Sequence, residues 1–205
     1  SVLPYGTIYS ALPVANGCTQ TVNAVDPVQG PIASLSLSHI LSSYPGGGEI
    51  SCKNASDGSI DLSVSGGTPN YIYYWTTGQG GELNSQDLTG LSAGNYHITV
   101  EDGNHCSTDT TITIGVPAPI TTTANINTAI CNGSSNGAID LSVSGGASPY
   151  DYQWSGPNGF TATTQDLTLL AAGVYIVSIT DANGCSTTQA FDITQAGGFT
   201  INANV

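Results

Sequence analysis

The sequence predicts an all-β protein built from small tandem domains. Stretches of alternating apolar and polar residues recur along the chain, and Gly, Pro, Asn and Ser residues separate them. Alternation with a period of two is typical of strands that have one buried and one exposed face. Few stretches carry the 3.6-residue rhythm of an amphipathic helix, so we expect short strands joined by turns.

A ten-residue stretch that occurs twice sets the period of these domains. GSIDLSVSGG spans 58–67 and GAIDLSVSGG spans 137–146, an offset of 79 residues. The same offset relates cysteines, aromatic residues and short motifs: Cys52 and Cys131, Tyr71 and Tyr150, Tyr73 and Tyr152, Trp75 and Trp154, Gln86–Thr89 and Gln165–Thr168, Tyr96 and Tyr175, Asp102 and Asp181, Asn104 and Asn183, Cys106 and Cys185. Self-similarity at this period indicates an array of domains rather than one large core.

The repeat positions divide the chain into two full and two partial domains. We expect a first full repeat at 31–117, with a nine-residue insertion before Cys52, and a second full repeat at 118–197. Residues 1–30 resemble the C-terminal strands of a preceding repeat, and residues 198–205 resemble the first strand of a following one. The chain is therefore expected to be either a window on a longer array or a subunit that exchanges strands end to end in a filament.

Each full repeat is predicted to form six or seven short strands. In the first repeat the expected strands cover 31–40, 58–65, 71–75, 95–101 and 108–114, with a variable loop or short edge strand at 78–85. We place the insertion at 42–48. Trp75 and Trp154 are expected in the core, and a core Trp with a Tyr on a late strand suggests a small immunoglobulin-like sandwich.

The strongly acidic composition limits the possible partners. The formal net charge is −13, and Lys53 is the single basic side chain apart from histidine. Nucleic acid is excluded as a natural partner because phosphate binding needs Lys and Arg. An anionic membrane surface would repel the chain, and no apolar run is long enough for a transmembrane helix. We interpret the acidity as a soluble, self-repelling surface without membrane insertion.

Two repeated Asp-x-Asn turns are the best candidates for calcium ligands. They comprise Asp102 with Asn104 and Asp181 with Asn183. The ordinary alternative is that Asp and Asn favour tight turns, and Asn183–Gly184 is itself a hairpin signal. No EF-hand loop with its distal Glu is present. We favour the turn interpretation and predict no cofactor.

Five cysteines on a repeating grid indicate an oxidising, extracytoplasmic compartment. The simplest pairing joins Cys52 to Cys106 and Cys131 to Cys185, each 54 residues apart, and leaves Cys18 unpaired. Cys52 precedes the second strand and Cys106 follows the sixth, which runs the same way, so the two are expected at opposite ends of a sandwich. An eight-residue strand spans about 26 Å, whereas a disulfide needs Cα atoms within about 7 Å. We favour the pairing within repeats, and the alternative joins Cys52 to Cys185 across repeats.

The search for catalytic residues argues against an enzyme. Residues 133–137 (GSSNG) match the nucleophile elbow of hydrolases, but they lead into a strand rather than a helix. The remaining candidates have no counterpart in the second repeat, as a repeated site would require: His39, His97, His105, Glu82 and Glu101. We predict neither catalytic nor metal-ligating residues.

The densest motifs resemble a known family of repeats. The string from Cys131 to Trp154, and L-x-A-G-x-Y followed by D-A-N-G-C at 170–185, are similar to the SprB-type repeat of giant gliding adhesins on Bacteroidota cells. That repeat resembles the polycystic-kidney-disease-type immunoglobulin-like domain. The first repeat departs from the pattern at Lys53–Asn54 and at Gly103–His105, which are surface turns. The resemblance implies export by the type IX route, a cell-surface location and a stalk-like role, but it implies no ligand.

Our leading hypothesis is a structural segment of a long surface adhesin or filament, with neighbouring repeats as its partners. The alternative is a carbohydrate-binding module of a secreted protein, which would bind surface polysaccharide through exposed aromatic rings. The candidate rings are Tyr44, Tyr74 and Phe160. Tyr74 corresponds to Gln153 in the second repeat, so such a platform would not be repeated.

Overall fold

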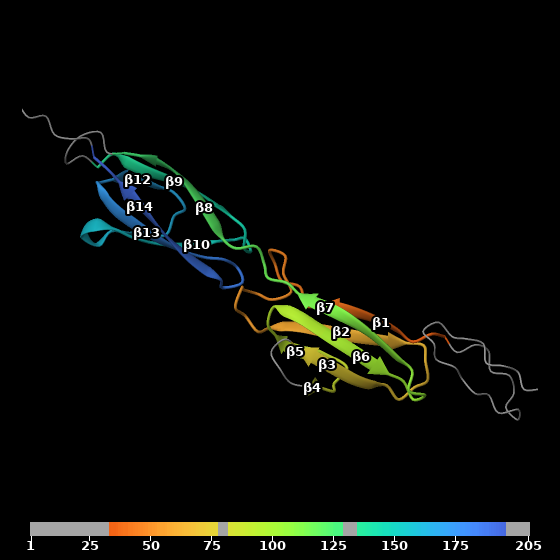
Figure 1. Ribbon diagram of the computed structural model, residues 1–205. Helices are drawn as coiled ribbons and strands as arrows, with labels where there is room; N and C mark the ends of the chain where they lie inside the picture. The colour runs from red at the N-terminus through yellow and green to blue at the C-terminus, as the bar shows by residue number, and fades with distance from the viewer. Residues whose placement is uncertain (1–32, 78–81, 129–134, 196–205) are drawn as a thin grey trace, which may run out of the picture. The chain divides into compact units, whose positions relative to one another are not determined.

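The computed structural model describes residues 33–77, 82–128 and 135–195 (Figure 1). The chain divides into two units. Within the described residues, unit 1 comprises 33–42 and 56–114, and unit 2 comprises 43–55 and 115–195. The predicted partial repeats at 1–30 and 198–205 lie outside the described residues.

Unit 1 consists of two antiparallel sheets (Figure 1). Its strands are β1 (Ser36–Leu41), β2 (Gly58–Ser65), β3 (Ile72–Thr77), β4 (Glu82–Leu83), β5 (Leu88–Leu91), β6 (Gly94–Glu101) and β7 (Ser107–Ile114). One sheet has the order β1-β2-β5, and the other has the order β4-β3-β6-β7.

Unit 2 repeats this arrangement strand for strand (Figure 1). It contains β8 (Thr121–Asn127), β9 (Gly137–Ser144), β10 (Asp151–Ser155), the short 3₁₀ turn η1 (Pro157–Gly159), β11 (Thr161–Ala162), β12 (Leu167–Leu170), β13 (Gly173–Thr180) and β14 (Ser186–Ile193). Its sheets have the orders β8-β9-β12 and β11-β10-β13-β14.

These strand orders confirm the predicted all-β, immunoglobulin-like fold. In each unit the first, second and fifth strands form one sheet, and the fourth, third, sixth and seventh form the other. Inward-facing residues of both sheets fill the core between them. The buried core of unit 2 comprises Ile139, Leu141, Trp154, Leu167, Leu170, Tyr175, Val177, Ile179 and Ile193. Trp75 occupies the equivalent buried position in unit 1, with 1% of its surface exposed.

Two features differ from the sequence-based expectation. The strands β5 and β12 were not predicted, because each is four residues long and only its two end leucines are buried. The first repeat is also not one continuous segment, since Ser43–Ala55 connects two strands of unit 1 but belongs to unit 2. We call residues 43–55 the crossover segment.

The repeated Gln-Asp pair directly precedes β5 and β12 and continues the sheet pairing ahead of their first residues. In unit 2 the side chain of Asp166 accepts a hydrogen bond from the backbone N–H of Leu141 at 2.9 Å. The side-chain amide of Gln165 donates to the carbonyl oxygen of the same residue. Gln86 and Asp87 bind Leu62 in the same way in unit 1. The two side chains thus satisfy backbone groups that a longer neighbouring strand would otherwise pair.

The repeated aromatic residues pack in the core, and each also donates a hydrogen bond. The indole N–H of Trp154 donates to the carbonyl oxygen of Thr164 at 2.8 Å, and Trp75 donates to Ser85 at the same distance. The hydroxyl of Tyr175 donates to the carbonyl of Ala171 at 3.1 Å, which joins the start of β13 to the preceding turn. A ring that is mostly buried needs such a partner for its polar atom.

We predict that Asp166→Ala lowers the free energy of unfolding of unit 2 by about 1–3 kcal/mol, because the buried N–H of Leu141 loses its acceptor. Urea unfolding followed by Trp fluorescence measures this in a Trp75→Phe background, where Trp154 is the remaining Trp of the two. The matched control is Asp140→Ala, whose carboxylate lies on the exposed face of β9. Equal effects of the two substitutions would contradict the capping role.

Candidate functional site: the Asp-x-Asn turn and its disulfide

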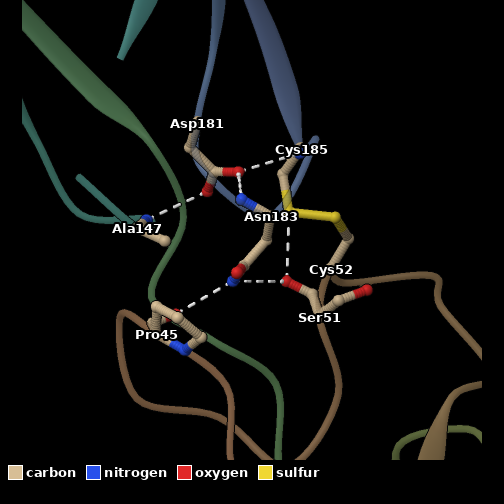
Figure 2. The surroundings of a disulfide bond; sticks show 7 residues. All are labelled: Pro45, Ser51, Cys52, Ala147, Asp181, Asn183 and Cys185. Carbon is tan, nitrogen blue, oxygen red and sulfur yellow. Dashed lines mark hydrogen bonds between the residues drawn. A yellow bond between two sulfur atoms is a disulfide. The ribbon is translucent and has the colours of Figure 1, made fainter. Parts of the chain in front are cut away.

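The buried carboxylate of Asp181 ties together two turns of unit 2 (Figure 2). Its Oδ1 accepts hydrogen bonds from the backbone N–H groups of Asn183 and Cys185, both at 2.9 Å. Its Oδ2 accepts from the backbone N–H of Ala147 at 3.0 Å. The carbonyl of Ala147 in turn accepts from the N–H of Ala182 at 2.8 Å. One side chain therefore connects the β13–β14 turn of one sheet with the turn that follows β9 in the other.

Asp102 makes the same connection in unit 1. Its Oδ1 accepts from the backbone N–H groups of Asn104 and Cys106, and its Oδ2 accepts from that of Thr68, all at 2.9 Å. Asp102 and Asp181 are both buried, with 4% and 6% of their surface exposed. The repeated Asp is therefore a turn cap, as favoured from the sequence.

The second glycine of each repeated Gly-Gly pair is needed because this carboxylate approaches the backbone closely. Gly67 and Gly146 have φ angles of +65° and +60°. A Cβ atom on Gly146 would lie 2.7 Å from Oδ2 of Asp181, and one on Gly67 would lie 2.8 Å from Oδ2 of Asp102. Both the left-handed backbone and the lack of space require glycine.

The hydrogen bonds also set the protonation of Asp102. Burial alone would raise the pKa of this carboxyl, but the backbone N–H groups of Thr68, Cys106 and Asn104, with the nearby His105, outweigh burial. The pKa of Asp102 therefore lies below its ordinary value of 3.8. The carboxylate is ionised at neutral pH, as a group that accepts three N–H bonds must be.

The disulfide joins Cys52 to Cys185, with Cα atoms 5.6 Å apart (Figure 2). The favoured pairing within repeats is wrong for these two residues, and the alternative across repeats is correct. The reason is the crossover segment, which carries Cys52 into unit 2 although the flanking strands belong to unit 1. Cys106 is also disulfide-bonded.

The crossover segment docks on unit 2 through backbone and side-chain contacts (Figure 2). The side-chain amide of Asn183 donates to the carbonyl oxygen of Pro45 at 2.9 Å and to that of Ser51 at 3.4 Å. A carboxylate oxygen of Glu49 accepts from the backbone N–H of Gly115 at 2.8 Å. The side chain of Ile50 is completely buried.

Sequence reasoning located the insertion in this connection but missed its docking. The available signals were an apolar Ile50 within a polar loop and the turn-forming Pro45–Gly48. Asn183 differs in use from its counterpart Asn104, whose amide donates to the hydroxyl of Thr68 in its own unit at 2.7 Å. The second repeat thus uses a shared residue to hold the inserted segment.

The aromatic candidates are divided between the two units. Tyr44 and Phe160 belong to unit 2, whereas Tyr74 lies on β3 of unit 1. Phe160 packs against Tyr175 in an edge-to-face arrangement, with ring centroids 5.2 Å apart. Tyr44 lies in the tight turn that pairs it with Gly48. Tyr74 is 45% exposed.

Of the remaining candidates, His105 contacts Glu101, whereas His39 and His97 lie on different sheets. His39 is on β1, His97 on β6 lies 3.8 Å from Asp109, and His105 in the next turn bonds Glu101. Across 33–77, 82–128 and 135–195, no three His, Cys, Asp or Glu residues gather as metal ligands would. The first residues of the GSSNG match lie outside the described residues, and its last glycine begins β9, a strand. The same ranges contain no helix long and apolar enough to span a bilayer.

We predict that unit 1 loses stability in acid through Asp102. Because its pKa is lower in the folded than in the unfolded state, the stabilisation is complete above the unfolded value and is lost as pH falls through the folded one. The loss is therefore expected below about pH 4. Asp102→Asn should lower stability at pH 7 by about 1.5–3 kcal/mol and flatten this dependence. Urea unfolding at pH 2–7 in a Trp154→Phe background measures both, and an unchanged pH profile would contradict the assignment.

We predict that Gly46→Ala undocks the crossover segment, whereas Gly47→Ala does not. The two glycines have similar φ angles of +84° and +78°, so both substitutions strain the backbone alike. A Cβ on Gly46 would lie 2.4 Å from the carbonyl oxygen of Gly146, whereas one on Gly47 meets nothing within 4 Å. After reduction, the Cys52–Cys185 bond should re-form more slowly in Gly46→Ala, as measured by non-reducing peptide mapping. Equal rates for the two variants would rule out docking as the cause.

Comparison with known proteins relates two segments of the chain to a family of repeats. Residues 49–80 and 123–159 match the family model described as SprB repeat. No curated protein matches the chain.

Solved structures similar to the chain include Ig domains and a fragment of intimin. The N-terminal eight Ig domains of Down Syndrome Cell Adhesion Molecule are 12% identical, with 80% of this chain and 25% of that chain covered and a TM-score of 0.36. The mouse nectin-like molecule 4 ectodomain is 13% identical, with 82% and 66% covered and a TM-score of 0.32. A C-terminal 282-residue fragment of intimin is 14% identical, with 80% and 64% covered and a TM-score of 0.29. The chain thus spans a quarter of the eight-domain molecule. Two segments of the chain thus match the SprB repeat, one that begins in the crossover segment and runs into unit 1 and one in unit 2.

Proposed function

We propose that this chain is a non-enzymatic structural segment of a long extracellular bacterial adhesin. The SprB repeat matches support an adhesin-type repeat, and the Cys52–Cys185 bond supports an oxidising compartment outside the cytoplasm. The finer parts of the proposal are a stalk role in gliding cells and export by the type IX route. Neighbouring repeats of the same fibre are its proposed partners.

The observation that carries the proposal is how the repeated polar residues are used. In unit 2 the side chains of Asp166, Gln165, Trp154, Tyr175 and Asp181 each bond a backbone group of their own unit. Their counterparts in unit 1 make the same bonds. What recurs between the copies is therefore the set of contacts that fixes the shape of the sandwich. This is the expected pattern when a repeat serves as a spacer.

A spacer must keep its shape when its ends are pulled, and the sheet pairing supports this. The first strand β1 is paired along all six of its residues with β2, and the last strand β14 is paired along all eight of its residues with β13. Tension along a strand axis loads the hydrogen bonds of a ladder together rather than one after another. Each unit is therefore expected to resist pulling until it yields in one step.

We predict that stretching the chain by its two ends in reducing buffer gives two separate unfolding steps, one for each unit. Each should occur at a resolved force peak, because the sandwich is cooperative. Single-molecule force spectroscopy measures the steps. Gradual extension without resolved peaks would overturn the stalk role.

A further inference from the structure

The Cys52–Cys185 bond connects points that are 133 residues apart in the chain. Between them lie β2–β7 of unit 1 and β8–β13 of unit 2. Yet both cysteines belong to unit 2, because the crossover segment brings Cys52 there. We propose that this disulfide is a covalent bypass that removes residues 53–184 from the path of tension along the fibre. The proposal rests on the proposed function, since it concerns a chain that is pulled by its ends.

The bypass follows from covalent connectivity alone. Tension that enters before Cys52 and leaves after Cys185 takes the shortest covalent route, which runs through the two sulfur atoms. Within the described residues, that route contains 33–52 and 185–195. It crosses a gap of 5.6 Å between the two Cα atoms instead of 133 residues of chain.

The described segments that remain under tension, 33–52 and 185–195, can lengthen only slightly. They contain β1 and β14, and strands already rise about 3.3 Å per residue, close to the fully extended limit of about 3.3–3.6 Å. The part of the crossover segment that lies between β1 and Cys52 on this route is held by hydrogen bonds. Its Pro45 accepts from Asn183, and its Glu49 accepts from Gly115. Its buried Ile50 adds an apolar anchor. Between Ser36 and Ile193 the oxidised chain is therefore expected to lengthen little under tension.

Breaking the bond would restore the full length. The 133 residues extend by up to about 450 Å at roughly 3.4 Å per residue. With the bond intact, β2–β13 lie outside the covalent path of tension. When the other cysteines are reduced or replaced, the redox state of this one pair would thus decide whether residues 53–184 can be stretched.

Force spectroscopy on the full chain, held at Ser1 and Val205, tests this directly. The first variant carries Cys18→Ser, Cys106→Ser and Cys131→Ser, so that Cys52 and Cys185 are its sole cysteines. The matched control adds Cys52→Ser and Cys185→Ser. The maximum extension of the oxidised first variant should be shorter by about 450 Å than that of the control. Dithiothreitol, which is oxidised to its cyclic disulfide as the two cysteines become thiols, should remove the difference.

Two results would overturn the bypass. One is equal maximum extension of the oxidised variant and the cysteine-free control. The other is failure of Cys52 and Cys185 to pair in the first variant, as shown by non-reducing peptide mapping. Extension reports the bypass and unfolding force reports the stalk role. If the control unfolds without a force peak while the oxidised first variant is still shorter than the control, the stalk role alone is contradicted.

Discussion

The buried carboxylate at the end of the sixth strand is the contact on which each unit depends. Asp102 and Asp181 join the turn between the last two strands of one sheet to the Gly-Gly turn that leaves the other. In a sandwich with a small core, the hydrogen bonds of this carboxylate fix how the two sheets meet at that end. In unit 2 the same turn presents Asn183 and Cys185 to the crossover segment. Closure of the fold and docking of the segment therefore share one structural element.

Contacts that occur in both units serve the fold, whereas contacts that occur in one unit hold the crossover segment. Contacts that occur in both units, such as those of Trp75 and Trp154, hold a sandwich together. Contacts that the second unit alone makes among the described residues, such as Asn183 with Pro45, hold the crossover segment. The insertion thus adds a connection to a repeat whose internal design is unchanged. A repeated unit can be modified in this way without disturbing its core.

The sequence predicted the parts of the fold that depend on alternation. The strand Gly58–Ser65 lies at its expected bounds, and Tyr96, Ile98 and Val100 face the core as alternation requires. The short strands β5 and β12 were missed because four residues carry too little pattern to distinguish a strand from a turn. The docking of Ile50 was missed because burial of a single apolar residue in a loop depends on a surface distant in sequence. Local rhythm cannot report such a contact.

Thermodynamic stability does not explain why the disulfide crosses repeats. A bond within a repeat would close 54 residues, whereas the observed bond closes 133. Loop-closure entropy grows only with the logarithm of length, so the longer loop contributes only about 0.8 kcal/mol more. What differs strongly between the schemes is connectivity. A bond within a repeat removes part of that repeat from the path of tension. The segment that joins it to the next repeat would still carry the tension. The bond between Cys52 and Cys185 places that segment, Gly115 included, inside the loop that it closes.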